Sequence, residues 1–405
     1  MRSMREGARS SKHLFKNTVV AASKLRVQAG NLRRSIWTDL LQHLVNPLAE
    51  KLRPSGVTDF VKKHVAPQRK PNGSPPVRPE TARPSIFVSY ATGETLKGSH
   101  WYCGGEKLLN NLVLLLRRHG YDAYMVSMDG GHSNWLVEHA PFLSVEEFAG
   151  RAAGGHPMRC VTSWVLADAF LQHCPGFYFW DQELATTSRS QFPALARHMR
   201  QGRIHATAGL NRSIQAWHMA IFERRASLLR TLVDERHWKP DEARRKRDRV
   251  GYMDEGALTA TFIETISSLI RSRGLELEFF RLAGIEADII KGMQTCSVFL
   301  ALNVGKSPLW GEGGPMTPHE AMACGAVPIC FDMNGPWELI QQGYNGFVLP
   351  EIRPELIAGQ LASIYSEPSR LEVLRKNALA VFQTSHCLES RWPFVCEFLR
   401  LPKDT

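Results

Sequence analysis

The stretch Gly311-Glu-Gly-Gly-Pro-Met-Thr-Pro-His-Glu-Ala-Met-Ala-Cys-Gly325, followed by Ala326-Val-Pro-Ile-Cys-Phe-Asp332, decides the fold expected for this chain of 405 residues. A Gly-rich loop enters a helix predicted over about 317–324, and a short apolar strand follows. The first turn of such a helix presents unpaired backbone N–H groups, and its dipole adds to their attraction for an anion. Glu312 and Glu320 flank this site and are suited to accept hydrogen bonds from sugar or ribose hydroxyls. On spacing alone, a helix with a Gly-rich entry and acidic residues at its favourable end is the alternative interpretation.

Strands and helices alternate on both sides of this stretch. The C-terminal half is predicted to contain helices over about 256–273 and 286–294 and strands over 275–282 and 297–302. The N-terminal half repeats the rhythm, with strands over 85–90, 121–128, 160–164 and 177–180, a helix over 106–119 closed by Gly120, and a helical stretch over 214–236. A strand, Gly loop, helix and strand in succession indicate a parallel sheet. We therefore expect an α/β fold with two Rossmann-like αβα lobes facing a central cleft.

The positive charge is concentrated at the N-terminus. The chain carries a formal charge of +11, and residues 1–83 hold seventeen Lys or Arg against five Asp or Glu. Apolar residues from Leu32 to Val45 recur at helical spacing, and six prolines follow between Pro67 and Pro84. The chain is predicted to consist of a basic amphipathic helical extension over 1–64, a Pro-rich linker over 65–84, an N-terminal Rossmann-like lobe over 85–245, a C-terminal Rossmann-like lobe over 246–385, and a C-terminal helix over 386–405 that packs back on the N-terminal lobe.

The stretch from Glu312 to Gly325 resembles the E-x7-E signature of the retaining glycosyltransferases of family four, which have the GT-B fold. The family pattern is matched at Glu312, Gly313, Glu320, Ala321, Met322, Ala323 and Gly325, then at Asn334-Gly335-Pro336 and Glu338. Gly343-Tyr-Asn-Gly-Phe-Val348 is similar to a further family element, and Tyr178-Phe-Trp-Asp-Gln-Glu183 resembles one of the rhamnosyltransferase-like branch. About 50 residues match closely.

The resemblance implies a metal-independent enzyme of hexosyltransferase type that moves a sugar from a nucleotide-sugar to a glycan or lipid-linked acceptor, with retention, as in polysaccharide biosynthesis. It implies that Glu320 holds the ribose hydroxyls and Glu312 the hydroxyls of the transferred sugar. Backbone amides at Gly313, Gly314, Met316 and Thr317 face the sugar and the diphosphate in this interpretation, and no cofactor is expected beyond the nucleotide-sugar co-substrate. The protein supplies positioning and charge stabilisation rather than a nucleophile.

Two departures from the family pattern concern the diphosphate. Asp254 and Glu255 stand where the family usually has cations, and Lys306 or Arg249 would have to replace them. Pro315 replaces a family glycine and removes one amide donor. These departures support an alternative hypothesis, a catalytically impaired GT-B-fold binding module in a larger glycan-assembly complex.

The N-terminal lobe offers further candidates. Gly104 and Gly105, before a predicted helix, resemble the family's Gly loop at the donor phosphates, and Lys107 in that helix is another phosphate candidate. His132 and Asp181 lie at expected carboxyl ends of strands and are predicted on the acceptor side, and an ordinary structural residue is the alternative interpretation of each.

Composition and targeting signals bound the location. The eight cysteines contain no C-x-x-C pair, so reduced thiols and a cytoplasmic chain are expected, and no group of Asp and His indicates a metal site. For residues 1–64 three interpretations stay open: a solvated charged face, docking on an anionic membrane surface as a peripheral protein of the inner face, and nucleic-acid binding. Nucleic acid is not an expected partner, because no zinc finger or basic stripe with interleaved aromatics is present.

Overall fold

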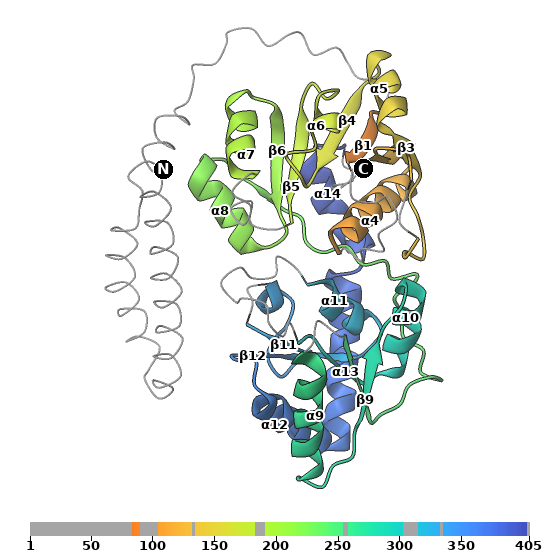
Figure 1. Cartoon of the computed structure of the whole chain (residues 1–405), viewed down its shortest axis with the longest axis vertical. Helices are drawn as coiled ribbons and strands as arrows, with labels where there is room; N and C mark the ends of the chain where they lie inside the picture. The colour runs from red at the N-terminus through yellow and green to blue at the C-terminus, as the bar shows by residue number, and fades with distance from the viewer. Residues whose placement is uncertain are drawn as a thin grey trace, which may run out of the picture. The chain divides into compact units, whose positions relative to one another are not determined.

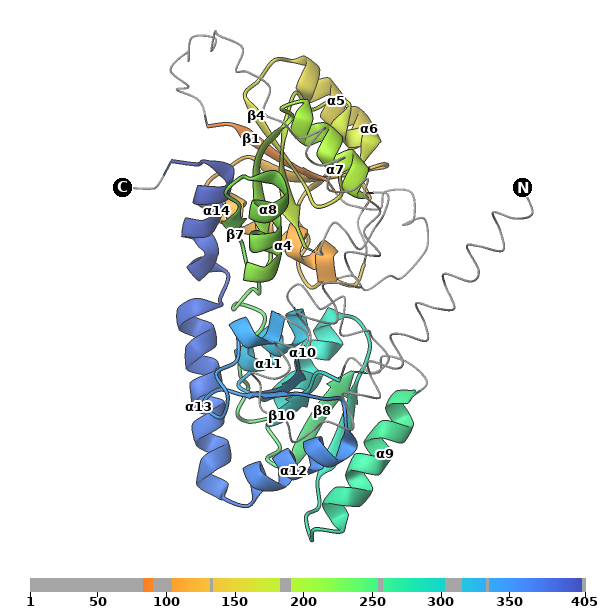
Figure 2. The same cartoon turned by 90° about the vertical axis from the view of Figure 1, so that its left-hand side faces the viewer.

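The computed structural model describes residues 83–89, 104–131, 134–182, 191–253, 258–302, 315–332 and 335–402. The predicted extension over 1–64 lies outside these residues. Residues 69–405 form one unit by their internal contacts. Within it, two separate parallel sheets are each covered by helices, as Figures 1 and 2 show. The expected α/β fold with two Rossmann-like lobes is confirmed.

The N-terminal lobe is built on a seven-stranded parallel sheet in the order β3-β2-β1-β4-β5-β6-β7. Its strands are β1 (Ser85–Ser89), β2 (Ala123–Ser127), β3 (Phe142–Ser144), β4 (Met158–Thr162), β5 (Phe177–Asp181), β6 (Ile204–Gly209) and β7 (Ser227–Leu228). Its helices are α4 (Gly104–Arg118), α5 (Val145–Ala153), α6 (Asp168–Leu171), α7 (Gln191–Arg200) and α8 (Arg212–Phe222). The central strand β1 pairs Val88 with Met125 of β2 and Val161 of β4.

Helix α4 is the element of this lobe that matters most for the site. Its apolar residues, Leu108, Leu112 and Leu115 among them, are buried in the core of the lobe. Gly120 follows the helix with φ of +75°, a left-handed conformation that glycine adopts without a Cβ penalty. The apolar stripe and this stop signal explain why the helix was predictable from the sequence.

The C-terminal lobe has a five-stranded parallel sheet in the order β12-β11-β10-β8-β9. Its strands are β8 (Arg249–Met253), β9 (Glu278–Leu282), β10 (Val298–Leu300), β11 (Val327–Phe331) and β12 (Phe347–Leu349). Its helices are α9 (Leu258–Arg271), α10 (Glu286–Thr295), α11 (Met316–Ala323), α12 (Pro354–Tyr365) and α13 (Pro368–Ser385), with short 3-10 helices η1 (Gly335–Glu338) and η2 (Glu389–Arg391). The predicted helix at 317–324 is thus α11, and it leads into β11 as expected.

The last helix, α14 (Trp392–Leu399), packs against β6 and β7 of the N-terminal lobe (Figure 2). Val395, Phe398 and Leu399 are fully buried there, in one cluster with residues of β1 and α4. The Trp392 ring stacks on His119 at the end of α4, with 3.7 Å between ring centroids. The chain therefore crosses between the lobes twice, after β7 and after α13.

Two details of the sequence prediction are wrong. The helix expected over 214–236 ends at Phe222, because Glu223 adopts φ of 50° and breaks it. The apolar residues that follow, including Leu229, Leu232 and Val233, are buried in an irregular segment that crosses between the lobes, which explains their misleading pattern. Strands β3, β6, β7 and β12 were not expected, since β3, β7 and β12 are very short and β6 alternates with His205 and Thr207.

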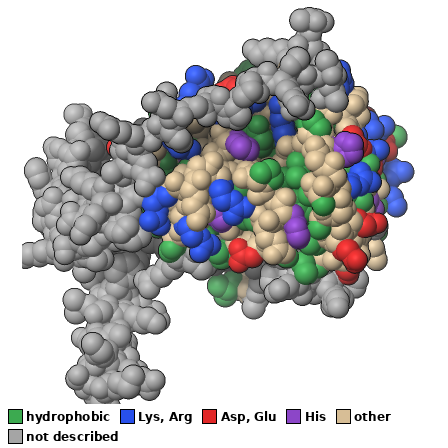
Figure 3. Space-filling view, turned by 90° about the horizontal axis from the view of Figure 1, so that it is seen from above, with side chains coloured by type: hydrophobic (Ala, Val, Ile, Leu, Met, Phe, Trp, Pro, Cys, Tyr) green, Lys and Arg blue, Asp and Glu red, His purple; other side chains and the backbone are tan. Residues whose placement is uncertain are grey.

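Charged side chains of both signs lie on the face of the molecule that Figure 3 presents. Figure 3 shows Lys and Arg side chains interspersed with acidic, His and apolar ones on the face that it presents. This fits the sequence, in which residues 84–405 hold thirty-three basic and thirty-four acidic residues. Among the described residues, no helix has the length and apolar character to cross a membrane.

Candidate functional site

Helix α11 begins with backbone groups that its own side chains leave uncapped. Pro315 stands at the N-cap with φ of −59° and ψ of 124°, and its side chain has no oxygen to accept a hydrogen bond from the amides of the first turn. The amides of Met316 and Thr317 lie in that first turn, while Pro318 has no N–H to offer. The helix dipole adds positive potential at the same place, so this end of α11 is suited to an anion.

The amino end of α4 meets the amino end of α11. Gly104 opens α4, and a Cβ built on it would lie 3.5 Å from Sδ of Met316. Met316 itself packs against the core clusters of both lobes. Two helix N-termini, one from each lobe, therefore converge on one place. The predicted donor-binding residues Gly104, Gly105, Met316 and Thr317 are brought together there.

Glu320 lies in the second turn of α11 and is buried, with 5% of its surface exposed. Its Oε1 accepts a hydrogen bond of 2.5 Å from Nζ of Lys107, in the first turn of α4. Lys107 is also ion-paired with Glu286, the first residue of α10, and lies over the ring of Trp238 at 4.2 Å from the centroid. The Lys107 amine is thus held by two carboxylates and an aromatic face, and is not exposed toward a phosphate.

Glu286 is the better satisfied of the two carboxylates. Its Oε1 accepts from Nε1 of Trp238 at 3.0 Å, and its Oε2 accepts from the amide of Val137 at 2.8 Å. Burial disfavours its charge, but Lys107 and these donors prevail and lower the pKa of Glu286. Burial raises the pKa of Glu320 instead, and the attraction of Lys107 offsets this only in part. For Lys107, burial alone would lower the pKa, but Glu320 and Glu286 outweigh it and raise the pKa.

A second contact joins the lobes beside this one. Glu338 of η1 accepts from the amide of Arg212 at 2.6 Å and from the guanidinium of Arg230 at 2.8 Å. Arg212 begins α8, so the carboxylate lies at the favourable end of that helix. Glu338 belongs to the matched family pattern, and here it fastens the C-terminal lobe to the N-terminal lobe.

Several predicted site residues lie outside the described residues: Glu312, Lys306, Gly313, Gly314, His132, Asp254 and Glu255. Their roles stay predictions.

Asp181 and Arg249 are found in positions that do not support the contacts expected of them. Asp181 ends β5 with 2% of its surface exposed, and its Oδ2 bonds Nε2 of His218 at 2.8 Å inside the lobe. Arg249 begins β8, at the opposite end of the strand from the carboxyl edge, and pairs with Glu278 at 2.5 Å. Burial and engagement in the lobe interior therefore separate Asp181 from an acceptor, and the strand's length separates Arg249 from the donor site.

Glu286 and Trp238 were missed as site residues. Glu286 was placed correctly at the start of a helix, but nothing in its neighbourhood distinguishes it from an ordinary acidic residue of a first turn. Trp238 follows the segment that was mistaken for a helix. Glu286 and Trp238 contact Lys107 only because the two lobes pack together. Contacts of this kind follow no regular spacing along the sequence, so a single sequence does not reveal them.

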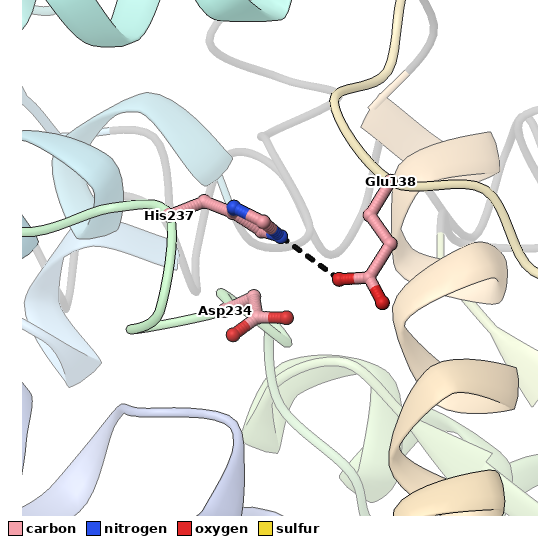
Figure 4. A group of neighbouring side chains, drawn as sticks. All are labelled: Glu138, Asp234 and His237. Atoms are coloured by element: carbon pink, nitrogen blue, oxygen red, sulfur yellow. Dashed lines mark hydrogen bonds and ion pairs between the residues drawn. The ribbon is translucent and has the colours of Figure 1, made fainter.

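One group among the described residues has the composition of a metal site: Glu138, Asp234 and His237, with ligand atoms within 4.8 Å of one another (Figure 4). The two carboxylates are already neutralised by arginine. The Arg236 guanidinium bonds both Asp234 and Glu138, and Arg118 bonds Asp234 as well. A cation would have to displace these guanidinium groups, so the cluster is an ion-pair network that ties the crossing segment to the N-terminal lobe.

Comparison with known proteins agrees with this geometry. Residues 263–381 match the family model described as "Glycosyl transferases group 1". No curated protein matches the sequence.

Solved structures share the fold at low sequence identity. Anabaena HepE in complex with UDP and glucose matches with a TM-score of 0.61 and 14% identity, over 78% of this chain and 100% of that one. Sucrose-phosphate synthase from Thermosynechococcus elongatus matches with a TM-score of 0.58 and 13% identity, over 78% and 98%. A glycosyltransferase from Rickettsia africae matches with a TM-score of 0.61 and 10% identity, over 79% and 100%. The chain thus has the GT-B fold, and its residues 263–381 are similar to the group 1 glycosyl transferases.

Proposed function

We propose that this protein is a retaining glycosyltransferase that moves a sugar from a nucleotide-sugar donor to a glycan or lipid-linked acceptor. The observation that supports it best is the position of Glu320 one turn behind the uncapped start of α11, inside the segment that matches the family model. In this proposal Glu320 accepts hydrogen bonds from the ribose hydroxyls, and the amides of Met316 and Thr317 donate to the diphosphate oxygens.

The convergence of the starts of α4 and α11 supports the diphosphate position. Each helix N-terminus is equivalent to roughly half a positive charge, and two of them near one place favour a multiply charged anion. The acceptor hydroxyl then attacks while the departing diphosphate is stabilised, so the enzyme needs positioning and fixed dipoles rather than a side-chain nucleophile. Glu312, with Gly313 and Gly314, is proposed to hold the transferred sugar.

The solved neighbours make a sugar nucleotide a reasonable donor class. HepE was solved with UDP and glucose and with UDP-glucose, and these ligands belong to that protein. For the present chain we propose the same class of donor, bound without a metal because helix termini supply the charge. Lobes over 85–245 and 246–385 would hold the acceptor and the donor. A cytoplasmic location, with residues 1–64 on an anionic membrane surface, completes the proposal.

Calorimetric titration with UDP-, GDP- and dTDP-sugars tests the proposed function. We expect one of these donors to bind, and Glu320→Ala to weaken its binding by about 100-fold, because each charge-assisted hydrogen bond to a ribose hydroxyl contributes about 1.5–3 kcal/mol. Glu355→Ala is the matched control, since Glu355 is an exposed acidic residue of the same lobe. Absence of binding by all three donor classes, or transfer unchanged in Glu320→Ala, would contradict the proposal.

The second candidate is a catalytically impaired GT-B binding module. The acidic pair Asp254 and Glu255, at positions where the family has cations, favours it. Donor binding without measurable transfer or donor hydrolysis would support this candidate against the enzyme. Chelation with EDTA tests whether the reaction needs a metal, because activity that survives EDTA agrees with a metal-independent reaction.

A further inference from the structure

The contact between Lys107 and Glu320 crosses from one lobe to the other. Lys107 belongs to α4 of the N-terminal lobe and Glu320 to α11 of the C-terminal lobe, and 213 positions of sequence separate them. Both side chains are almost completely buried, with 4% and 6% of their surfaces exposed. A charged pair at this depth is strongly coupled, and the loss of either partner leaves the other charge without compensation.

The amine of Lys107 is fixed from three directions. Glu286 pairs with it from α10, and the ring of Trp238 lies on it from the crossing segment. Trp238 in turn donates to Glu286 at 3.0 Å. These neighbours hold Lys107 in an orientation in which its amine also donates to Oε1 of Glu320.

This lysine leaves Glu320 usable as an acceptor. A carboxylate has about four lone-pair positions on two oxygens, and Lys107 takes one of them on Oε1. Because Lys107 also forms an ion pair with Glu286, the two carboxylates share one positive charge. Two charged groups face Glu320 from the elements packed against it: Lys107 of α4 and Glu286 of α10. Burial and Glu286 raise the pKa of Glu320, whereas Lys107 lowers it.

We propose that Lys107 is a positioning residue of the donor site: from the N-terminal lobe it holds Glu320 as a fixed, charged acceptor for the ribose hydroxyls. The site is then complete only while α4 and α11 are in contact, so lobe contact and nucleotide binding reinforce each other. This inference rests on the proposed function and adds to it a residue that the family pattern around Glu320 does not contain.

The test compares Lys107→Met with Glu286→Gln in the full chain. Methionine keeps the apolar stem of the lysine and removes its charge. Glu286→Gln removes the second carboxylate that pairs with the Lys107 amine. Calorimetry measures the affinity for whichever of UDP, GDP and ADP the wild type binds best, and for its 2′-deoxy counterpart, between pH 6.0 and 8.5.

We expect Lys107→Met to bind the ribonucleotide at least tenfold more weakly at pH 7 and to lose further affinity as the pH falls, because burial raises the pKa of Glu320 and the lysine no longer opposes this. Wild type should change less over the same range. Glu286→Gln should shift the pH dependence of nucleotide affinity in the opposite direction, because Lys107 then forms an ion pair with Glu320 alone. The preference for ribose over deoxyribose should shrink in Lys107→Met, and Lys107→Arg should restore part of it.

Two results would overturn the inference. Tighter binding by Lys107→Met would show that Lys107 blocks the ribose position instead of preparing it. An unchanged pH profile and an unchanged ribose preference, at equal thermal stability, would show a purely structural role. If Lys107→Met does not fold, the opposed shifts expected for Glu286→Gln and Lys107→Arg decide the question. Failure of the wild type to bind any of the UDP-, GDP- and dTDP-sugars refutes the proposed function itself, and this inference with it.

Discussion

The two lobes have the same plan of parallel strands and covering helices, but they place their functional groups in the sequence differently. In the C-terminal lobe the family match over 263–381 contains Glu320 and the start of α11, which lie within a few positions of each other. The match does not extend to the N-terminal lobe. There Lys107 reaches its partners only across the lobe contact, at Glu286 and Glu320.

The difference has a physical cause. A helix N-terminus provides its anion-binding groups from consecutive backbone amides, so such a site is local in sequence. The charge balance around a buried carboxylate depends on whatever the fold packs against it, so it is distributed over the chain. The comparison therefore predicts that substitutions of partners distant in sequence have large effects, and three experiments test this.

The largest effect is expected for Phe398→Ala. Phe398 is fully buried in the N-terminal lobe although it lies near the end of the chain, and its ring packs edge-on to Tyr178 at 5.7 Å between centroids. Removing it should lower the free energy of unfolding by about 3–5 kcal/mol, measured by urea unfolding. Phe394→Ala on the same helix is the control, because Phe394 is 38% exposed and its loss should cost about 0.5 kcal/mol or less. Equal losses of stability in Phe398→Ala and Phe394→Ala would contradict the packing of α14 in the core of the N-terminal lobe.

A smaller effect is expected for Asp234→Asn. Asp234 is buried and pairs with Arg118 of α4 and with Arg236, and although burial opposes its charge, these arginines lower the pKa of Asp234. Its loss should cost about 2–3 kcal/mol at pH 7, because Arg118 is left partly buried without its partner. A carboxyl whose folded pKa is depressed stabilises the protein above its unfolded pKa. The difference between wild type and Asp234→Asn should therefore shrink as the pH falls below about 4.

Urea unfolding at pH 7, 4 and 3 measures this difference. Asp241→Asn is the control, since Asp241 pairs with the exposed Arg244 at 2.9 Å and should contribute about 0–1 kcal/mol. A difference that stays constant from pH 7 to pH 3 would contradict the role given to the Asp234 charge.

The smallest effect is expected for His386→Asn, at the second crossing between the lobes. His386 lies 5.2 Å from His319 of α11 between ring centroids, and burial lowers the pKa of His386 to about 2 and that of His319 to about 3. Both rings are therefore neutral in the folded protein, while the unfolded chain protonates them below about pH 6.5. The two histidines therefore do not reduce the free energy of unfolding above about pH 6.5. Below that pH, the free energy of unfolding falls by about 1.4 kcal/mol per pH unit for each histidine.

Asparagine keeps an acceptor for Arg391, which donates to Nδ1 of His386 at 2.7 Å. His386→Asn should remove about half of the pH dependence that the two histidines cause between pH 6 and pH 5. Urea unfolding at these two pH values measures it, and identical slopes for wild type and variant would contradict the burial of a neutral pair at this crossing.

The sequence was sufficient for elements whose signals are continuous along the chain. Helix α4 combines an apolar stripe with the left-handed Gly120, and α11 combines a Gly-rich entry with Glu320. The segment after Phe222 was misread because burial at a crossing gives apolar residues without a helix. Arg249 begins β8, so the rule that ligands bind at the carboxyl ends of parallel strands argues against its expected phosphate contact.

The sequence by itself determined that two α/β lobes form, that residues 311–325 resemble the E-x7-E signature, and that the excess positive charge lies in residues 1–83. Periodicity, glycine and proline positions and local charge are properties of neighbouring residues, so one chain is enough to reveal them. Only the tertiary structure brought the starts of α4 and α11 together and placed Lys107 between Glu320 and Glu286. Burial and the identity of the facing groups decide the charge state of such residues, and both arise only when the lobes are packed.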